Sequence, residues 1–322
     1  MTVLRAEDLV ARFRSGDRAA LARLLSFVEN DRPAGSRAMA ELYRETGRAE
    51  IIGITGPPGA GKSTLTNALI RAYRARGKSV GVLAVDPSSS LTGGATLGDR
   101  IRMLENYEDD GVYIRSLATR GEMGGLSIAI GAATHLLDAF GFDIICIETV
   151  GVGQDEVDIA ELADTTLLLQ VPNHGDSIQT IKAGVLEIAD ILVVNKTDTP
   201  GAHDLVRDLR TMLHLGDHRP WLPPIVETVA TRNENIDKLL DQIARHRSYL
   251  AESGEGERRR IQRVRQEVLR LARRWHIAQL QATLDDTDMA EILERVACRE
   301  IDPFQVAVDV ARRTALRLQD SA

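Results

Sequence analysis

The spacing of apolar residues changes twice along the chain. In the first segment, apolar positions recur every three or four residues, as at Leu21, Leu24, Leu25 and Val28, which is typical of helices that bury one face. From Ile51 onward, short apolar runs alternate with helical stretches, and after residue 249 the spacing is helical again. The helices predicted for the two outer segments are 8–14, 18–29, 37–46, 258–281, 289–295 and 303–318.

The middle segment contains short apolar runs that predict strands at 51–55, 80–85, 112–115, 143–148, 165–171, 191–194 and 225–228. Strands that alternate with helices form a doubly wound, mostly parallel sheet. Ligands of such α/β sheets bind beyond the carboxyl ends of the strands. We therefore expect a helical N-terminal extension over residues 1–48, an α/β domain over 49–250 and a helical C-terminal arm over 251–322.

A glycine-rich loop follows the first predicted strand and reads Gly56-Pro57-Pro58-Gly59-Ala60-Gly61-Lys62-Ser63-Thr64. The backbone N–H groups of such a loop can surround phosphate oxygens at the positive end of the next helix. Lys62 would then reach the β- and γ-phosphates, and the Ser63 hydroxyl would ligate Mg²⁺. A glycine-rich turn without a ligand is the alternative, but the flanking strand and helix favour a P-loop NTPase fold.

A second motif, Asn195-Lys196-Thr197-Asp198, follows the predicted strand 191–194. A carboxylate at Asp198 can accept two hydrogen bonds from guanine N1–H and the exocyclic amine, whereas adenine presents an acceptor at N1. Asn195 would brace the loop, and the stem of Lys196 would lie over the plane of the base. The tetrad alone could be an ordinary strand-end turn, but its position after a strand of the α/β pattern favours a GTP site.

Three carboxylates are candidates for magnesium coordination beside Ser63. Asp86 and Glu148 lie at the ends of predicted strands, where a charge next to a buried strand needs a partner. Asp99 lies in a glycine-rich segment and could instead cap the helix that follows it. Mg²⁺ prefers oxygen ligands and keeps several waters, so these side chains suit it.

The run Glu148-Thr149-Val150-Gly151-Val152-Gly153-Gln154 has glutamate where the Asp-x-x-Gly run of Ras-like GTPases has aspartate. Gly151 can offer its backbone N–H to a γ-phosphate, and the next glycine allows the segment to rearrange after hydrolysis. We interpret the run as a switch that phosphate contacts hold in one of two states. Gln154 could orient the attacking water, although a solvated loop glutamine is the simpler interpretation.

Composition narrows the possible functions further. The formal net charge of −7 argues against a nucleic-acid binder that works through positive potential. No apolar run reaches the length of a membrane span, and residues 1–30 lack a signal-peptide pattern, so we expect a cytoplasmic protein without a membrane partner. Cys146 and Cys298 provide neither a disulfide framework nor the spacing of metal ligands.

These motifs, together with Val85-Asp86-Pro87-Ser88-Ser89 and Gly98-Asp99, resemble those of the MeaB/ArgK family, the GTPases that escort methylmalonyl-CoA mutase. The resemblance spans nearly the whole chain. It implies a GTPase, slow alone and stimulated by its partner, that uses GTP, GDP and Mg²⁺. It also implies a chaperone that gates adenosylcobalamin delivery to methylmalonyl-CoA mutase or a related acyl-CoA mutase, and that protects or reactivates this partner.

The resemblance also implies roles for individual residues. The metal would be held by Ser63, Asp86, Asp99 and Glu148, with Lys62 and Glu148 serving catalysis, and Val229-Ala230-Thr231 would form a second guanine-contact loop. Lys182 would couple the nucleotide state to the mutase, with a solvated helix lysine as the alternative. The apolar stripe in the predicted helix 258–281 fits either packing on the chain's own core or a dimer contact, and the homodimer of the family favours the dimer.

Two other functions share parts of this pattern. A maturation GTPase that delivers nickel or cobalt has the same nucleotide core and a glutamate-type switch. The chain lacks a Cys-x-Cys site, however, and its seven histidines are dispersed, with His214 and His218 the closest to a metal-binding pair. A transport-linked phosphotransfer protein would use ATP, against which Asp198 argues.

Overall fold

The computed structural model describes residues 6–86, 108–118, 125–149, 155–172, 186–215 and 220–320, with the side chains of residues 6, 7, 86, 118, 125–127, 155–158 and 320 left out. The chain divides into two compact units, residues 1–263 and 264–322. Each unit has its own hydrophobic core.

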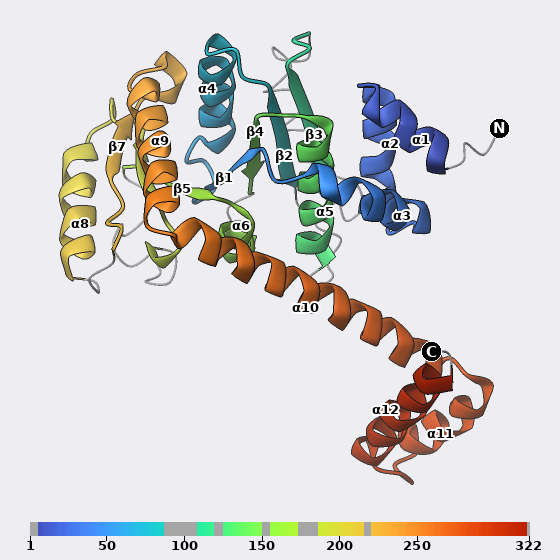
Figure 1. The fold of residues 1–322 in the computed structure, drawn as a ribbon. Helices are drawn as coiled ribbons and strands as arrows, with labels where there is room; N and C mark the ends of the chain where they lie inside the picture. The colour runs from blue at the N-terminus through green and yellow to red at the C-terminus, as the bar shows by residue number, and fades with distance from the viewer. Residues whose placement is uncertain are drawn as a thin grey trace. The chain divides into compact units, whose positions relative to one another are not determined.

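The first unit is built on a parallel sheet of seven strands in the order β3-β2-β4-β1-β5-β6-β7 (Figure 1). The strands are β1 (Glu50–Thr55), β2 (Val80–Asp86), β3 (Val112–Ala118), β4 (Ile144–Glu148), β5 (Thr165–Gln170), β6 (Ile191–Asn195) and β7 (Ile225–Thr228). Every predicted strand is present, which confirms the doubly wound α/β fold. The register pairs Ile54 with Glu148, so the loop after β1 and the end of β4 lie at the same edge of the sheet.

Helices cover both faces of this sheet (Figure 1). Those described in the first unit are α1 (Ala6–Arg14), α2 (Arg18–Glu29), α3 (Pro33–Leu42), η1 (Tyr43–Glu45), α4 (Lys62–Ala75), α5 (Gly125–Phe140), α6 (Asp155–Leu162), α8 (Ala202–Leu215), η3 (Ala230–Arg232) and α9 (Ile236–Glu252). α4 and α9 bury Leu69 and Leu239 in the same core as Ile54 of β1. α5 and α6 bury Leu137 and Ile159 against side chains that point to the opposite face.

The helices α1, α2 and α3 pack beside α5 and extend the core that α5 and α6 form on their face of the sheet. α3 begins at Pro33 rather than at residue 37, because proline is favoured in the first turn, where its missing N–H is not needed. Asp138 of α5 accepts hydrogen bonds from the backbone N–H groups of Arg48 (3.1 Å) and Ala49 (2.9 Å). This carboxylate therefore fixes the chain where it enters β1.

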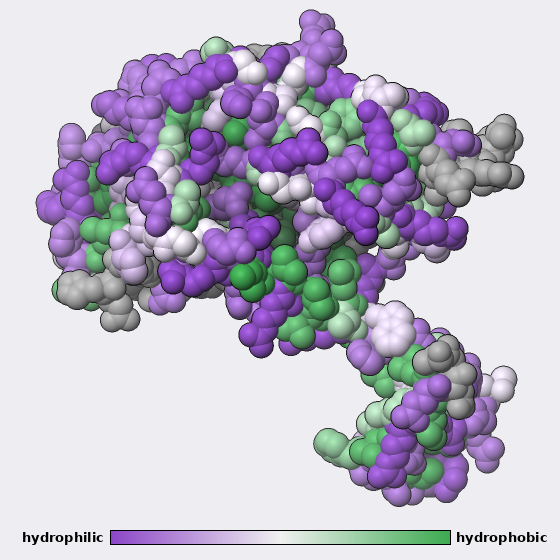
Figure 2. All heavy atoms as spheres, viewed as in Figure 1, coloured by the Kyte–Doolittle hydropathy of each residue, from purple (hydrophilic) through white to green (hydrophobic). Residues whose placement is uncertain are grey.

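The helix α10 (Glu255–Leu284) begins in the first unit and ends in the second. It starts directly after Gly254, whose φ of +70° separates it from α9. In the second unit, the end of α10 packs with α11 (Thr287–Ala297) and α12 (Pro303–Asp320) around Met289, Val306 and Val310. Figure 2 shows apolar side chains at the surface over α10. Ile261 and Val268 of this helix are exposed.

Two further observations bear on the sequence predictions. Cys146 is buried in β4 and Cys298 is exposed, and both are free thiols. Within the described part of the chain, every helix is too short or too polar to cross a lipid bilayer.

Candidate nucleotide-binding site

The glycine-rich loop between β1 and α4 has a shape that two of its glycines make possible. Gly56 has a φ of +141°, and a Cβ atom there would lie 2.4 Å from the carbonyl oxygen of Leu169. Gly61 has a φ of +90°, and a Cβ atom there would lie 2.6 Å from Nδ2 of Asn195. The positive φ angles and the close neighbours both require glycine, so the loop is fixed against β5 and the end of β6.

Lys62 is the first residue of α4 and is buried. Its Nζ donates hydrogen bonds to the carbonyl oxygens of Gly56 (2.8 Å) and Pro57 (3.0 Å). The ammonium group therefore lies over the loop, next to the N-terminal end of α4. The positive end of a helix and an adjacent lysine together form a site suited to a phosphate group.

Glu148 ends β4 and contacts the first turn of α4. It is 6% exposed, and its Oε1 accepts a 2.5 Å hydrogen bond from Ser63 Oγ. Its Oε2 accepts a 2.8 Å hydrogen bond from Thr66 Oγ1, one turn further along the helix. Hydrogen bonds from two hydroxyls stabilise this charge, which burial would otherwise disfavour.

The Ser63 and Glu148 side chains supply oxygen atoms at one place, which suits a hard cation. Mg²⁺ is commonly bound by one or two carboxylates together with substrate phosphates. The pair lies next to the loop that would hold those phosphates, so the residues present fit a magnesium ion. Among the described residues, no three His, Cys, Asp or Glu side chains gather into a metal-binding group.

Asn195 joins three segments at the end of β6. Its side chain is 2% exposed, and Nδ2 donates to the carbonyl oxygen of Ala60 at 2.9 Å. Its Oδ1 accepts hydrogen bonds from the backbone N–H of Ala230 at 3.1 Å and from Thr228 Oγ1 at 3.2 Å. The phosphate loop, β6 and the turn after β7 are thus connected through one amide group.

Lys196 and Asp198 lie on the exposed side of this network. Lys196 has a φ of +59°, and its Nζ donates to the carbonyl oxygen of Gly59 at 2.8 Å. The Asp198 carboxylate is 40% exposed and lies 3.4 Å from Nη2 of Arg232. Arg232 in turn pairs with Glu234 at 2.9 Å. The Lys196 side chain therefore reaches the phosphate loop from the end of β6, whereas the Asp198 carboxylate lies beside Arg232.

The predicted segment Val229-Ala230-Thr231 follows β7, and the N–H of Ala230 contacts Asn195. The structure therefore brings the predicted guanine-contact segments together beside the phosphate loop. The predicted positions Asp99, Gly151, Gln154 and Lys182, and the side chain of Asp86, lie outside the described residues.

Three residues that contact the candidate site were not predicted from the sequence. Thr66 holds Glu148, Thr228 holds Asn195, and Arg232 pairs with Asp198. The spacing of Thr66, three residues after Ser63 on the same helix, places both hydroxyls on one face and is the one usable signal. Thr228 and Arg232 reach their partners through strand pairing and a turn, which no local pattern reveals.

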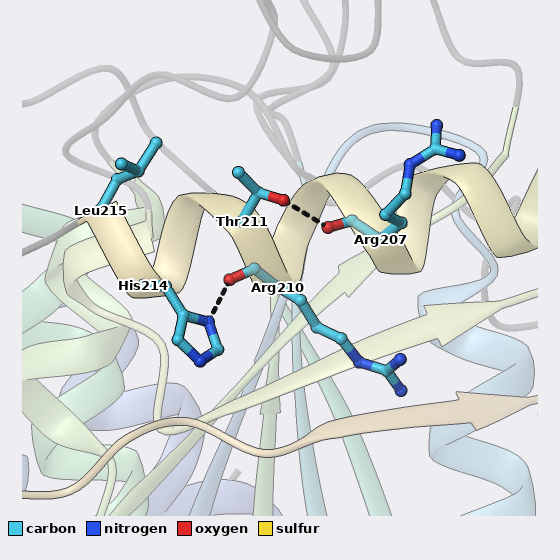
Figure 3. A pocket seen from close by; sticks show the side chains of 5 residues that line it. All are labelled: Arg207, Arg210, Thr211, His214 and Leu215. Atoms are coloured by element: carbon cyan, nitrogen blue, oxygen red, sulfur yellow. Dashed lines mark hydrogen bonds between the residues drawn. The ribbon is translucent and has the colours of Figure 1, made fainter.

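A separate hollow of about 390 Å³ lies on α8 (Figure 3). It is lined by Arg207, Arg210, Thr211, His214 and Leu215, all from this helix. Two of these side chains contact backbone carbonyl oxygens of the same helix. The ring of His214 lies 2.6 Å from the carbonyl oxygen of Arg210, and the hydroxyl of Thr211 donates to the carbonyl oxygen of Arg207 at 3.0 Å. Its lining includes none of the predicted site residues.

The parallel sheet, the glycine loop that leads into α4 and the buried carboxylate at the end of β4 define a P-loop nucleotide-binding protein. The comparison with known families is more specific. A model of the family described as "Methylmalonyl Co-A mutase-associated GTPase MeaB" matches residues 21–285. The chain belongs to this family and is a GTPase, which confirms the resemblance drawn from the motifs.

Individual relatives agree with this assignment. A protein of Pyrococcus abyssi (strain GE5 / Orsay) is 47% identical over 305 residues, which cover 94% of each chain. The GTPase ArgK of Escherichia coli (strain K12) is 35% identical over 270 residues, which cover 81% of this chain and 80% of ArgK. Among solved structures, one described as an LAO/AO transport system kinase superposes with a TM-score of 0.70 at 27% identity and covers 99% of both chains.

Proposed function

We propose that the chain binds GTP and GDP with Mg²⁺ at the carboxyl edge of its sheet. The observation that carries this proposal is the buried carboxylate of Glu148, hydrogen-bonded to Ser63 at the start of α4. The loop from Gly56 to Thr64 and Gly151 would bind phosphates, with Lys62 at the β- and γ-phosphates. Ser63 and Glu148 would hold the metal, with Asp86 and Asp99 as further ligands.

The base would be read beside the Asn195 network. The Asp198 carboxylate would accept the guanine N1–H and amine, and Lys196 would cover the base. Asn195 would hold the phosphate loop and the Val229–Thr231 segment in register, which its three hydrogen bonds support. A magnesium ion held by Ser63 and Glu148 would supply positive charge at the phosphates, and Lys62 would add its own to stabilise the charge that develops during hydrolysis.

The family description supports a partner. We propose that the chain is a cytoplasmic chaperone of methylmalonyl-CoA mutase or a related acyl-CoA mutase, whose nucleotide state gates delivery of adenosylcobalamin. Partner binding would stimulate hydrolysis and would be sensed through Gln154 and Lys182. The exposed apolar side chains of α10, among them Val264 and Val268, support a homodimer formed by the C-terminal arm.

Affinity capture tests the partner. The protein is loaded with GDP or with a non-hydrolysable GTP analogue, and the captured fraction is assayed for adenosylcobalamin-dependent mutase activity. We expect mutase recovery to differ between the two nucleotides. The variant Lys62→Ala should lose this dependence, whereas Lys78→Ala, an exposed lysine paired with Asp143 at 2.9 Å, should keep it.

The outcomes separate the two parts of the proposal. If no mutase is recovered while the protein hydrolyses GTP, the chaperone role is wrong and the nucleotide site stands. If calorimetry on folded protein detects neither GDP nor GTP binding at millimolar concentration, the assignment of the nucleotide site is wrong. Unchanged mutase recovery with Lys62→Ala would show that capture does not depend on the nucleotide.

A further inference from the structure

A second hydroxyl holds the carboxylate of Glu148 from within α4. Thr66 is completely buried, and its Oγ1 lies 2.8 Å from Oε2 of Glu148. Ser63 contacts the other oxygen, Oε1, from the preceding turn of the same helix. The two oxygens of the carboxylate are therefore held separately by hydroxyls that one rigid helix carries.

The two contacts differ in what a metal would do to them. The Ser63 hydroxyl could offer a lone pair of Oγ to a cation and still point its proton to Glu148. Thr66 lies one turn further along α4 and contacts the other carboxylate oxygen, so its hydroxyl would hold Oε2 whether or not the metal is bound. It would thus keep the plane of the carboxylate fixed while ligands exchange.

Thr66 Oγ1 also lies 3.0 Å from the carbonyl oxygen of Lys62, the backbone contact that a buried helical threonine commonly makes. The hydroxyl has a single proton and can donate it fully to one acceptor. The ionised carboxylate is the nearer acceptor and the stronger one, because a charge-assisted hydrogen bond exceeds a neutral one. The contact to Glu148 is therefore more than a by-product of helix geometry.

We propose that Thr66 is a positioning residue that orients Glu148 toward the magnesium ion. The inference rests on the proposed role of Glu148 as a metal-binding residue. Groups that orient metal ligands in this way commonly change metal affinity by about ten- to a hundred-fold when they are removed. Thr66 should therefore set the affinity for Mg²⁺ while leaving the phosphate and base contacts intact.

The test replaces the hydroxyl by a methyl group in the full-length protein. Thr66→Val is compared with Thr66→Ser, which keeps the hydroxyl, and with Thr134→Val as a matched control. Thr134 is also buried in a helix, α5, and its Oγ1 donates to the carbonyl oxygen of Ile130 at 2.8 Å. The control therefore removes a helical back-bond of the same kind.

Two binding measurements serve as readouts. Fluorescent GDP is titrated over a range of Mg²⁺ concentrations and in EDTA, and Mn²⁺ binding to the GDP complex is followed by electron paramagnetic resonance. We expect Thr66→Val to weaken Mg²⁺ and Mn²⁺ binding about ten-fold or more, with GDP affinity in EDTA unchanged. Thr66→Ser and Thr134→Val should match the wild-type protein.

Wild-type metal affinity in Thr66→Val would overturn the inference, as would an equal loss in Thr134→Val. If Thr66→Val does not fold by circular dichroism, Thr66→Ala repeats the measurement without placing a methyl group against the carboxylate. A wild-type protein whose GDP affinity does not respond to Mg²⁺ would instead refute the metal site of the proposed function, and the inference with it.

Discussion

The amide of Asn195 offers the sharpest test of how the site is assembled. Replacing it by alanine removes the acceptor for the N–H of Ala230 and the donor to the carbonyl oxygen of Ala60. Each buried backbone group left unpaired destabilises the fold by about 1–3 kcal/mol. The Thr228 hydroxyl can rotate to another acceptor, so we count the two backbone groups only. We expect Asn195→Ala to lower the free energy of unfolding by about 2–6 kcal/mol.

Urea unfolding followed by tryptophan fluorescence measures this loss. The chain has two tryptophans, and a Trp275→Phe background leaves Trp221, which packs against His246 in the first unit, as the reporter. The dependence of unfolding on urea should keep its slope, because the buried area is unchanged. Asn30→Ala, which alters an exposed asparagine at the end of α2, should change stability by less than about 1 kcal/mol. A loss below about 1 kcal/mol for Asn195→Ala would refute the reasoning.

Three further predictions concern base recognition and pH. Asp198→Asn should weaken GDP binding about 100-fold, because it alters charge-assisted hydrogen bonds of about 1.5–3 kcal/mol each. The same variant should bind xanthosine diphosphate better than the wild-type protein does, because the 2-carbonyl of xanthine can accept a hydrogen bond from the new amide. Arg232→Ala should change GDP affinity by less than about five-fold, because the ion pair between Arg232 and Asp198 is long and exposed. Calorimetric titration of both variants with GDP and with xanthosine diphosphate measures these changes in affinity. Burial lowers the pKa of His246, so the unfolded state takes up the proton first, and the unfolding free energy should fall as pH drops below about 6.5. A His246→Phe variant should lose this part of the slope in urea unfolding between pH 7 and 5, and identical slopes would contradict it.

The features that local pattern determines were predictable from the sequence. All seven strands lie where the apolar runs place them, because each run is bounded by turn residues and is long enough to be buried. The phosphate loop was predictable because the glycine spacing encodes the backbone shape itself, as Gly56 and Gly61 show. Helix starts were less exact, and α10 begins at Glu255 rather than at residue 258 because a helix can start directly after the left-handed Gly254.

The contacts between motifs could not be predicted from local pattern. Glu148 meets Ser63 and Thr66 because the register of β1 and β4 brings the end of one strand beside the helix that follows the other. Asn195 meets Ala60 because β5 is the single strand between β1 and β6, so the loop after β1 and the end of β6 lie close together at the same edge of the sheet. Such contacts depend on the order of the strands in the sheet, and the sequence pattern is compatible with more than one order.

The edge of the sheet where the strands begin and the edge where they end make different contacts. Asp164 and Asp190 precede β5 and β6 at the amino edge, where their carboxylates accept the backbone N–H groups of Ile51 and Thr166. The same two carboxylates bind Arg263 (2.5 Å) and Arg259 (2.9 Å) in the first turns of α10. The N-terminal part of α10 is therefore attached at the edge where the strands begin, and the candidate site lies at the edge where they end. β5 connects these two edges, because it starts beside Asp164 and its Leu169 carbonyl lies against Gly56 of the phosphate loop.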